Sequence, residues 1–273
     1  MKILLLIMNS RNLLNRQQIV KNTWLRDWPF DYRFYVGRGN VSVNSDVIQL
    51  DCEDDYLNLH VKQGMVVDYA LRNFDFDYIF NCDDNTYVVV DRLLKCNLFN
   101  LDYLGFPCLL GAVEYAQGAC GYFLSRKAAE TFVETPLTDP IYQMAGTPSD
   151  FLLGAILASK GIFLTHNYLF NMGKYITDAQ GTKGYANVLP TLENKYISAH
   201  YCDENTMYRL YRHFHGGNEN IINSYLVKSE ITGVEYRVFE ENGFFYISSN
   251  QHLFGPFDSA LEAEKKVIAF ENP

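Results

Sequence analysis

The sequence has little positive charge. It contains 23 Lys and Arg residues against 32 Asp and Glu residues, which gives a net charge of -9 over 273 residues. Proteins that bind nucleic acids or anionic membranes generally do so through clustered Lys and Arg side chains. We therefore expect no nucleic-acid partner, although this composition would still allow a local basic groove.

Long apolar runs and metal-type cysteine pairs are also absent. The opening run, Met1–Met8, ends at Asn9, and no small-residue cleavage site follows. It therefore predicts a first strand rather than a signal peptide. No other segment reaches the length needed to span a bilayer, and the six cysteines show no CxxC spacing of the kind found in zinc sites. We expect a chain with reduced thiols and no transmembrane segment, located in the cytoplasm, or in the host cytoplasm if the protein is viral.

The order of apolar patterns indicates an α/β fold. Strand-like runs alternate with amphipathic helices, which is typical of a mixed, parallel-rich sheet flanked by helices. In such folds ligands bind at the carboxyl ends of the strands. The expected strands cover 2–8, 32–36, 47–50 and 78–82, and the expected helices cover roughly 16–24, 58–73, 125–133 and 149–160.

Three polar residues, Asp83, Asp84 and Asn85, stand between the apolar runs 78–82 and 86–90. Carboxylates that follow a buried strand need a cation or hydrogen-bond donors as partners. Mn²⁺ and Mg²⁺ prefer oxygen ligands and leave coordination positions for phosphate oxygens. The pattern therefore indicates a site for a metal-bound diphosphate, and an ordinary turn stabilised by Asp and Asn side chains is the competing interpretation.

Two later segments add to this picture. The small-residue stretch Gly118–Gly121 lets the backbone approach a ligand closely, or is a plain turn before a buried strand. Asp150 stands in the first turn of the expected helix 149–160, where an acid serves as a reactive group or as a helix cap. A region between 102 and 108 is expected to be a loop.

The character of the chain changes near residue 223. Short strands are expected at 225–227, 235–239 and 244–248 with a hairpin turn at 241–243, and a capping box at Ser259 opens a final helix. We therefore expect two domains, a ligand-binding domain over 1–222 and a small ββα appendage over 223–273. The appendage lacks a cluster of catalytic residue types, which favours an interaction or stabilising role.

Separate segments together resemble the β-1,3-galactosyltransferase and Fringe family of inverting glycosyltransferases. The motifs occur in the family's order from about residue 9 to 164, which is over half the chain. The matching segments are Arg16–Trp24 (RQQIVKNTW), Phe34–Gly37 (FYVG), Asp46–Lys62 with its unusual Tyr-x-Asn-Leu-x-x-Lys, Asp83–Val88 (DDNTYV), Tyr115–Ser125 (YAQGACGYFLS) and Ser149–Gly154 (SDFLLG).

This resemblance implies a GT-A, Rossmann-like architecture. It also implies a nucleotide-sugar donor, usually a UDP-sugar, a glycan or glycoconjugate acceptor, and the cofactor Mn²⁺ (or Mg²⁺). Asp150 would be the catalytic base, and the metal would be bound by Asn85, Asp83 and His200. The donor would be bound by residues at the ends of the first strands and in the matching motifs, namely Asn9, Ser10, Arg16, Lys62, Asp83 and Asp84.

The sequence departs from the family at two positions. Asn85 replaces the third acid of the family's triplet, so a neutral amide oxygen stands where a carboxylate normally binds the metal. Ser149 replaces the acid before the expected base. His200 has a structural alternative, with His213 and His215 as competing metal ligands, and Arg16 has the alternative of a helix-surface ion pair.

Two other functions remain compatible with these residues. A metal-dependent phosphotransferase or nucleotidyltransferase would use the same acids, but would be expected to carry a second acid cluster or a Gly-rich phosphate loop. A non-catalytic carbohydrate-binding or assembly protein could retain the fold after losing full metal binding, and Asn85 is the main support for it. The sequence specifies neither the sugar nor the linkage.

Overall fold

The computed structural model describes most of the chain. The described residues are 1–39, 45–137, 139, 148–172, 174–177, 183–186, 189–190, 194–215, 224–228, 235–241, 244–249 and 252–257. The chain divides into two compact units, Met1–Met207 and Tyr208–Pro273, whereas the sequence places a domain boundary after residue 222. Each unit is described by itself.

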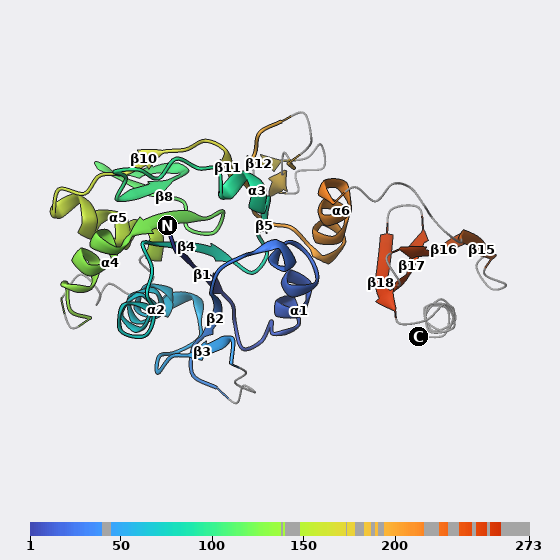
Figure 1. Ribbon diagram of the computed structural model, residues 1–273, viewed down its shortest axis with the longest axis horizontal. Helices are drawn as coiled ribbons and strands as arrows, with labels where there is room; N and C mark the ends of the chain where they lie inside the picture. Colours follow the sequence, from blue (N-terminus) through green and yellow to red (C-terminus); the bar gives the residue numbers. More distant parts are fainter. Residues whose placement is uncertain are drawn as a thin grey trace. The chain divides into compact units, whose positions relative to one another are not determined.

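A seven-stranded sheet forms the centre of the first unit (Figure 1), in the strand order β10-β6-β9-β4-β1-β2-β3. Strands β1, β2, β3 and β4 are parallel neighbours, whereas β9 lies antiparallel between β4 and β6. The expected mixed, parallel-rich sheet is therefore confirmed. The strands are β1 (Ile3–Met8), β2 (Tyr32–Val36), β3 (Val47–Gln49), β4 (Tyr78–Asp83), β6 (Tyr103–Gly105), β9 (Tyr122–Ser125) and β10 (Thr165–His166).

Helices cover both faces of this sheet, as expected. Helices α2 (Leu59–Asn73), α4 (Arg126–Val133) and α5 (Ser149–Ser159) pack against one another on one face, and α1 (Asn15–Asn22) lies on the other (Figure 1). The 3₁₀ turn Trp24–Asp27 and the short helix α3 (Val90–Leu93) contact each other. No helix in the described part of the chain combines the length and apolar composition required to cross a bilayer.

The sheet is buried because its central strands are apolar on both faces. Strand β1 has five consecutive buried residues from Ile3 to Ile7. The core beneath α2, α4 and α5 includes Leu4, Val66, Phe132 and Leu153. Cys52 and Cys82 are buried thiols, in agreement with their strand-like surroundings in the sequence.

Several short strands were not expected. The predicted loop at 102–108 is wrong, because β6 and the start of β7 (Pro107–Leu110) occupy it, and β7 forms a hairpin with β8 (Val113–Ala116). Strands of three or four residues carry too little periodicity to be recognised, and their pairing partners stabilise them. A further hairpin joins β12 (Lys174–Thr177) to β13 (Lys183–Ala186).

A small second sheet lies beside the acidic turn. Strand β14 (Ser198–Ala199) is parallel to β11 (Phe170–Asn171) and antiparallel to β5 (Tyr87–Val88). The apolar run 86–90 is therefore only partly strand, since α3 begins at Val90. This pairing brings the chain around residue 200 next to the residues that follow β4.

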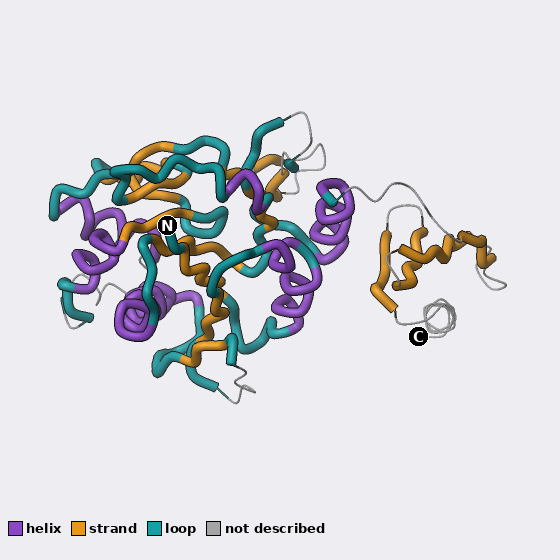
Figure 2. Tube along the Cα trace, in the orientation of Figure 1, coloured by secondary structure: helices purple, strands orange, loops and turns teal. Residues whose placement is uncertain are grey.

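The chain divides within helix α6 (Glu204–Phe214). The second unit contains an antiparallel sheet of β15 (Ser224–Lys228), β16 (Glu235–Glu241), β17 (Phe244–Ser249) and β18 (His252–Phe257), drawn as orange segments in Figure 2. Three of these strands were predicted. Strand β18 corrects the predicted ββα arrangement, because it adds a strand to the sheet. The predicted helix from Ser259 lies outside the described residues.

Candidate functional site

The acidic turn lies at the switch point of the central sheet. The chain builds β1, β2 and β3 outwards in one direction and then places β4 on the other side of β1, and ligands bind at such reversals. Met8 at the end of β1 is in register with Asp83 at the end of β4. The backbone N–H of Asp84 donates to the Met8 carbonyl oxygen at 3.0 Å. The loop after β1 and the acidic turn are therefore direct neighbours.

Two adjoining cavities, with volumes of ≈ 280 and ≈ 180 Å³, open at this edge of the sheet. They share Met8, Tyr56, Leu59 and Asp83 as lining residues, so they form one cleft. The larger of the two, the donor-side cavity, is lined by the predicted residues Asn9, Ser10, Arg16, Lys62, Asp83, Asp84 and Asn85. The smaller, the base-side cavity, is lined by Asp83, Asp150 and His200. The structure thus brings all the predicted site residues together.

A third cavity, of ≈ 490 Å³, is larger but contains none of the predicted residues. It lies between β3, α2 and the end of α4, and its lining includes Tyr69, Val133 and Leu137. Size alone does not make a reactive site, since reactive chemistry needs convergent polar groups. We therefore place the site in the cleft beside Asp83.

Both carboxylate oxygens of Asp84 are already bonded within the protein. Oδ2 accepts from Asn9 Nδ2 at 2.5 Å, and Oδ1 accepts from Arg16 Nη1 at 3.0 Å. Gln17 Nε2 donates to Asn9 Oδ1 at 2.8 Å. Burial raises the pKa of Asp84, and Arg16 opposes that rise. The ion pair considered for Arg16 exists, but its partner is Asp84, which joins helix α1 to the acidic turn.

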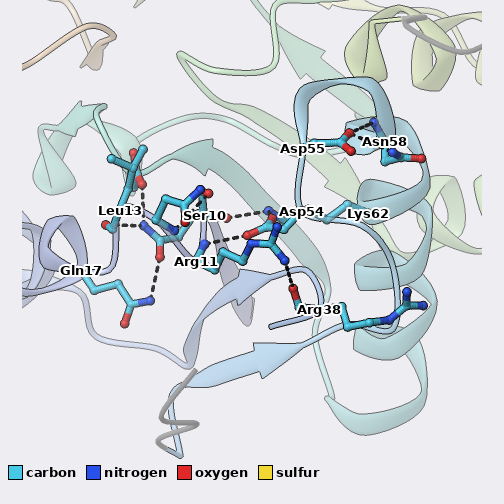
Figure 3. A network of polar contacts seen from close by, with 12 residues as sticks. Ser10, Arg11, Leu13, Gln17, Arg38, Asp54, Asp55, Asn58 and Lys62 are labelled. Atoms are coloured by element: carbon cyan, nitrogen blue, oxygen red, sulfur yellow. Dashed lines mark hydrogen bonds and ion pairs between the residues drawn. The ribbon is translucent and has the colours of Figure 1, made fainter. Parts of the chain in front are cut away.

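A buried ion pair holds the loop after β1 against the segment before α2 (Figure 3). Lys62 Nζ donates to Asp54 Oδ1 and to the carbonyl oxygen of Asn9, both at 2.6 Å. Asp54 Oδ2 accepts from the backbone N–H of Arg11 at 2.6 Å. Both charged side chains of the pair are 1% exposed. Lys62 therefore has two protein partners at the cavity wall, and its contact with a donor stays a prediction.

Asp83 differs from Asp54 and Asp84, whose carboxylates are bonded within the protein. Its carboxylate accepts no hydrogen bond from the residues that the structure describes. Burial and the neighbouring carboxylates of Asp84 and Asp150 raise the pKa of Asp83 to about 7. Asn85 Oδ1 is also buried without a hydrogen-bond partner. Two adjacent oxygen groups that lack partners are suited to a cation.

Thr86 controls the tautomer of His200. Thr86 Oγ1 donates its single proton to the Ala119 carbonyl oxygen at 2.7 Å, so it must accept from His200 Nδ1, 3.1 Å away. The proton of the neutral ring is therefore on Nδ1, and the lone pair is on Nε2. Burial, with a smaller effect of Arg16, lowers the pKa of His200 to about 4. A neutral imidazole is the form that binds metals.

Asp83, Asn85 and His200 would give a divalent cation one charged ligand and two neutral ones. No group of three or more His, Cys, Asp and Glu residues suitable for a metal occurs in the described ranges. The set would instead combine Asp83, His200 and the amide oxygen of Asn85, a mixture of oxygen and nitrogen donors that Mn²⁺ accepts. The Cys202 backbone N–H donates to the Asn85 carbonyl oxygen at 2.8 Å, which ties the two segments together. His213 and His215 belong to the second unit.

Asp150 lies in the first turn of α5 and is not its N-cap, which is Pro148. Its Oδ2 accepts from the Gly118 backbone N–H at 3.0 Å, outside the helix, and Oδ1 accepts from Phe151 N–H at 2.9 Å. Burial raises the pKa of Asp150 although these hydrogen bonds oppose the rise. A Cβ at Gly118 would lie 3.1 Å from Asp150 Cβ. The small-residue turn therefore allows close backbone approach to Asp150 rather than being only a turn.

A comparison with protein-family models matches residues 39–101 to the family described as Galactosyltransferase. The matched range contains Asp54 and Lys62 as well as the acidic turn. It confirms the resemblance to a galactosyltransferase family over this segment. The relation to Fringe stays a prediction.

Solved structures that resemble the chain are glycosyltransferases. One, "involved in the glycosylation of the major capsid of PBCV-1", aligns with 61% of this chain and 81% of its own at 11% identity and a TM-score of 0.40. The apo form of the glycosyltransferase GlyE from Streptococcus pneumoniae TIGR4 aligns with 62% of this chain and 46% of its own. Its identity is also 11% and its TM-score is also 0.40. Likenesses this weak carry no argument about activity, which must come from the site.

Proposed function

We propose that the chain is an inverting glycosyltransferase that moves a sugar from a nucleotide-sugar donor, a UDP-sugar, to a hydroxyl group of a glycan acceptor. The observation that carries the proposal is the position of Asp83, which lines both cavities of one cleft. A donor group at Asp83 therefore lies next to the cavity that holds Asp150. The galactosyltransferase match over 39–101 supports the same chemistry.

The donor-side cavity would hold the nucleoside diphosphate. Backbone and side-chain groups of Asn9 and Ser10 stand at the end of β1, and Arg16 provides a partly exposed guanidinium, 36% accessible. Asp84 keeps Asn9 and Arg16 in place, and its own contact with the donor stays a prediction. A bound Mn²⁺ would neutralise the charge that develops on the leaving diphosphate. Asp83, Asn85 and His200 would hold that ion.

Asp150 would be the general base. Its carboxylate takes the proton of the acceptor hydroxyl as that oxygen forms a bond to the anomeric carbon of the donor sugar. The bond between this carbon and the diphosphate oxygen breaks on the opposite side, and the nucleoside diphosphate leaves with the electron pair. Attack opposite the leaving group inverts the anomeric configuration. A base with a raised pKa is stronger, and the hydrogen bond from Gly118 fixes its orientation.

Substitution of Asp150 tests the role of the base. We expect Asp150→Asn to lower the release of UDP from a panel of UDP-sugars with Mn²⁺ by about 10²–10⁴-fold, the usual contribution of a general base. The affinity for UDP, measured by calorimetry, should stay within about twofold, because Asp150 lines only the base-side cavity. Asp91→Asn, an exposed acid in α3, is the matched control. Loss of UDP binding with unchanged turnover would remove Asp150 from this role.

The same panel separates the alternative functions. A phosphotransferase or nucleotidyltransferase would yield products cleaved at a phosphate bond, and a non-catalytic carbohydrate-binding protein would release no UDP. Asn85 favours the second of these alternatives, because an amide attracts a cation less than a carboxylate does. GDP-sugars added to this panel test the choice of nucleotide. The β-1,3 linkage and the cytoplasmic location stay predictions.

A further inference from the structure

The wall of the base-side cavity contains two buried amides that the mechanism above does not use. Gln63 comes from α2 and Asn81 from β4, and both line the cavity together with Asp83 and Asp150. They are 2% and 3% exposed. Neither carries a charge, so neither serves as a base or as a strong metal ligand.

One end of each amide is bonded to a tyrosine. Gln63 Nε2 donates to the Tyr122 hydroxyl at 2.6 Å, and Asn81 Oδ1 accepts from the Tyr35 hydroxyl at 2.9 Å. Asn81 and Tyr122 are also register partners on the neighbouring strands β4 and β9. The tyrosines therefore hold one end of each amide in the cavity wall.

The other end of each amide has no hydrogen-bond partner in the part of the chain that the structure describes. Gln63 Oε1 is buried without a hydrogen bond, and Asn81 Nδ2 donates to no group among the residues that the structure describes. Exchanging the oxygen and nitrogen of Gln63 would leave the nitrogen unpaired instead, so one atom lacks a partner in either orientation. An unsatisfied buried polar group costs about 1–3 kcal/mol. A ligand that supplies the missing partners would recover this cost.

We propose that Gln63 and Asn81 form a subsite for a sugar hydroxyl group and determine which sugar the base-side cavity accepts. A hydroxyl both donates and accepts, so such a group has the chemistry to donate to the Gln63 oxygen and to accept from the Asn81 amide nitrogen. Sites that hydrogen-bond a substrate hydroxyl reject analogues that lack it, because their buried polar groups are then left unpaired. The proposal rests on the proposed function. The sugar is that of the donor or that of the acceptor.

Calorimetry with Gln63→Met tests the subsite. Methionine preserves the length and volume of the side chain but removes both hydrogen-bonding atoms. The probes are UDP, UDP-galactose and UDP-glucose, each with Mn²⁺, and methyl β-galactoside and methyl β-glucoside added to the UDP complex. UDP should bind the variant as it binds the unmodified chain. One sugar-containing probe should bind about tenfold more weakly, the size of one hydrogen bond.

The pattern of losses identifies the source of the hydroxyl. A loss confined to a UDP-sugar assigns it to the donor, and a loss confined to a methyl glycoside assigns it to the acceptor. Equal affinities for every sugar probe in a folded Gln63→Met variant would overturn the subsite. If the unmodified chain binds neither UDP nor any UDP-sugar, the proposed function fails first, and the subsite falls with it.

Two controls keep the test independent of folding. Gln18→Met changes an exposed glutamine of α1 and should alter no affinity. Deoxy analogues of the sugar probe that binds the unmodified chain, each lacking one hydroxyl, remove the contact from the ligand side and need no variant. One analogue should bind the unmodified chain about tenfold more weakly and show no further loss with Gln63→Met. Equal binding of every deoxy analogue to the unmodified chain would contradict the proposal.

Discussion

Two aspartates, Asp54 and Asp83, line the same cleft and have opposite electrostatic environments. Asp54 is bonded by the Lys62 ammonium and by the Arg11 backbone N–H. Burial opposes ionisation of Asp54, but these donors keep its pKa below the usual value. Asp83 accepts no hydrogen bond from the described residues and is flanked by other acids, which together with burial raise its pKa to about 7. One carboxylate is satisfied by the protein, and the other is not.

This difference separates a structural acid from a reactive one. The charge of Asp54 is compensated inside the fold, so its role is to hold the loop after β1 in position through Lys62 and Arg11. Among the described residues, the charge of Asp83 has no compensating group within hydrogen-bond distance, although the charges of Lys62 and Arg16 act to lower its pKa. Groups with strongly raised pKa values in a cleft are typical of functional sites. The same residue type thus serves stability in one place and ligand binding in the other.

The largest expected effect comes from breaking the buried ion pair. Lys62→Met leaves the Asp54 carboxylate buried without its cation, which costs about 3–5 kcal/mol of the free energy of unfolding. Asp83→Asn removes a charge that the folded state disfavours, so stability at pH 7 should be unchanged or higher. Urea denaturation of the two variants measures both values.

Lys95→Met is the matched control, because Lys95 is exposed on the turn after α3. Its effect should lie within about 0.5 kcal/mol, as for most surface substitutions. A stable Lys62→Met protein with greatly weakened UDP binding would assign Lys62 to direct donor contact instead.

A smaller effect should come from the hydroxyl that orients His200. Thr86→Val preserves the shape of the side chain but removes the acceptor for His200 Nδ1–H. Groups that orient a metal-binding histidine typically contribute about 10–100-fold to metal affinity. Titration with Mn²⁺ in the presence of UDP measures the loss.

Thr131→Val, which removes an exposed hydroxyl bonded to the Lys127 carbonyl oxygen, is the control for that experiment. We expect its Mn²⁺ affinity to equal that of the unmodified chain. If Thr86→Val behaves in the same way, His200 is a structural histidine.

The smallest expected effect is on the way the free energy of unfolding changes with pH in acid. The pKa of Asp54 is lower in the folded chain than its ordinary value near 3.9. Its contribution is therefore fully present above that value and is lost as the pH falls through the lower, folded value. Asp54→Asn should lose stability at pH 7 and depend less on pH below about 4. Urea unfolding of both chains between about pH 2 and pH 7 measures how the free energy of unfolding depends on pH. Parallel curves of this free energy against pH would contradict the prediction.

The sequence predicted the elements with long apolar patterns. Strand β2 has the expected bounds, and helix α2 follows the apolar stripe that includes Val66 and Ala70. Ser125 was expected to open a helix, and its Oγ accepts from the Ala128 backbone N–H at 3.0 Å. These features depend on neighbours within one turn or one strand, so local sequence is sufficient to reveal them.

The sequence did not reveal the residues that support the site. Gln17 and Thr86 act through partners far along the chain, respectively Asn9 and His200. Gln63 is one polar residue among the buried residues of α2. A polar residue on the buried side of a helix was the only signal available, and such a residue is more often bonded internally than functional.

The sequence by itself determined the parallel strands, their helices and the polar residues at the strand ends, because hydrophobic periodicity and turn chemistry are local properties. The tertiary structure alone decided which acid is neutralised. Asp54 and Asp83 both follow apolar strands in the sequence, and only the folded chain brings Lys62 to the first and Asp84 and Asp150 to the second. Electrostatic energy depends on distance in space and on burial, which the order of residues does not contain.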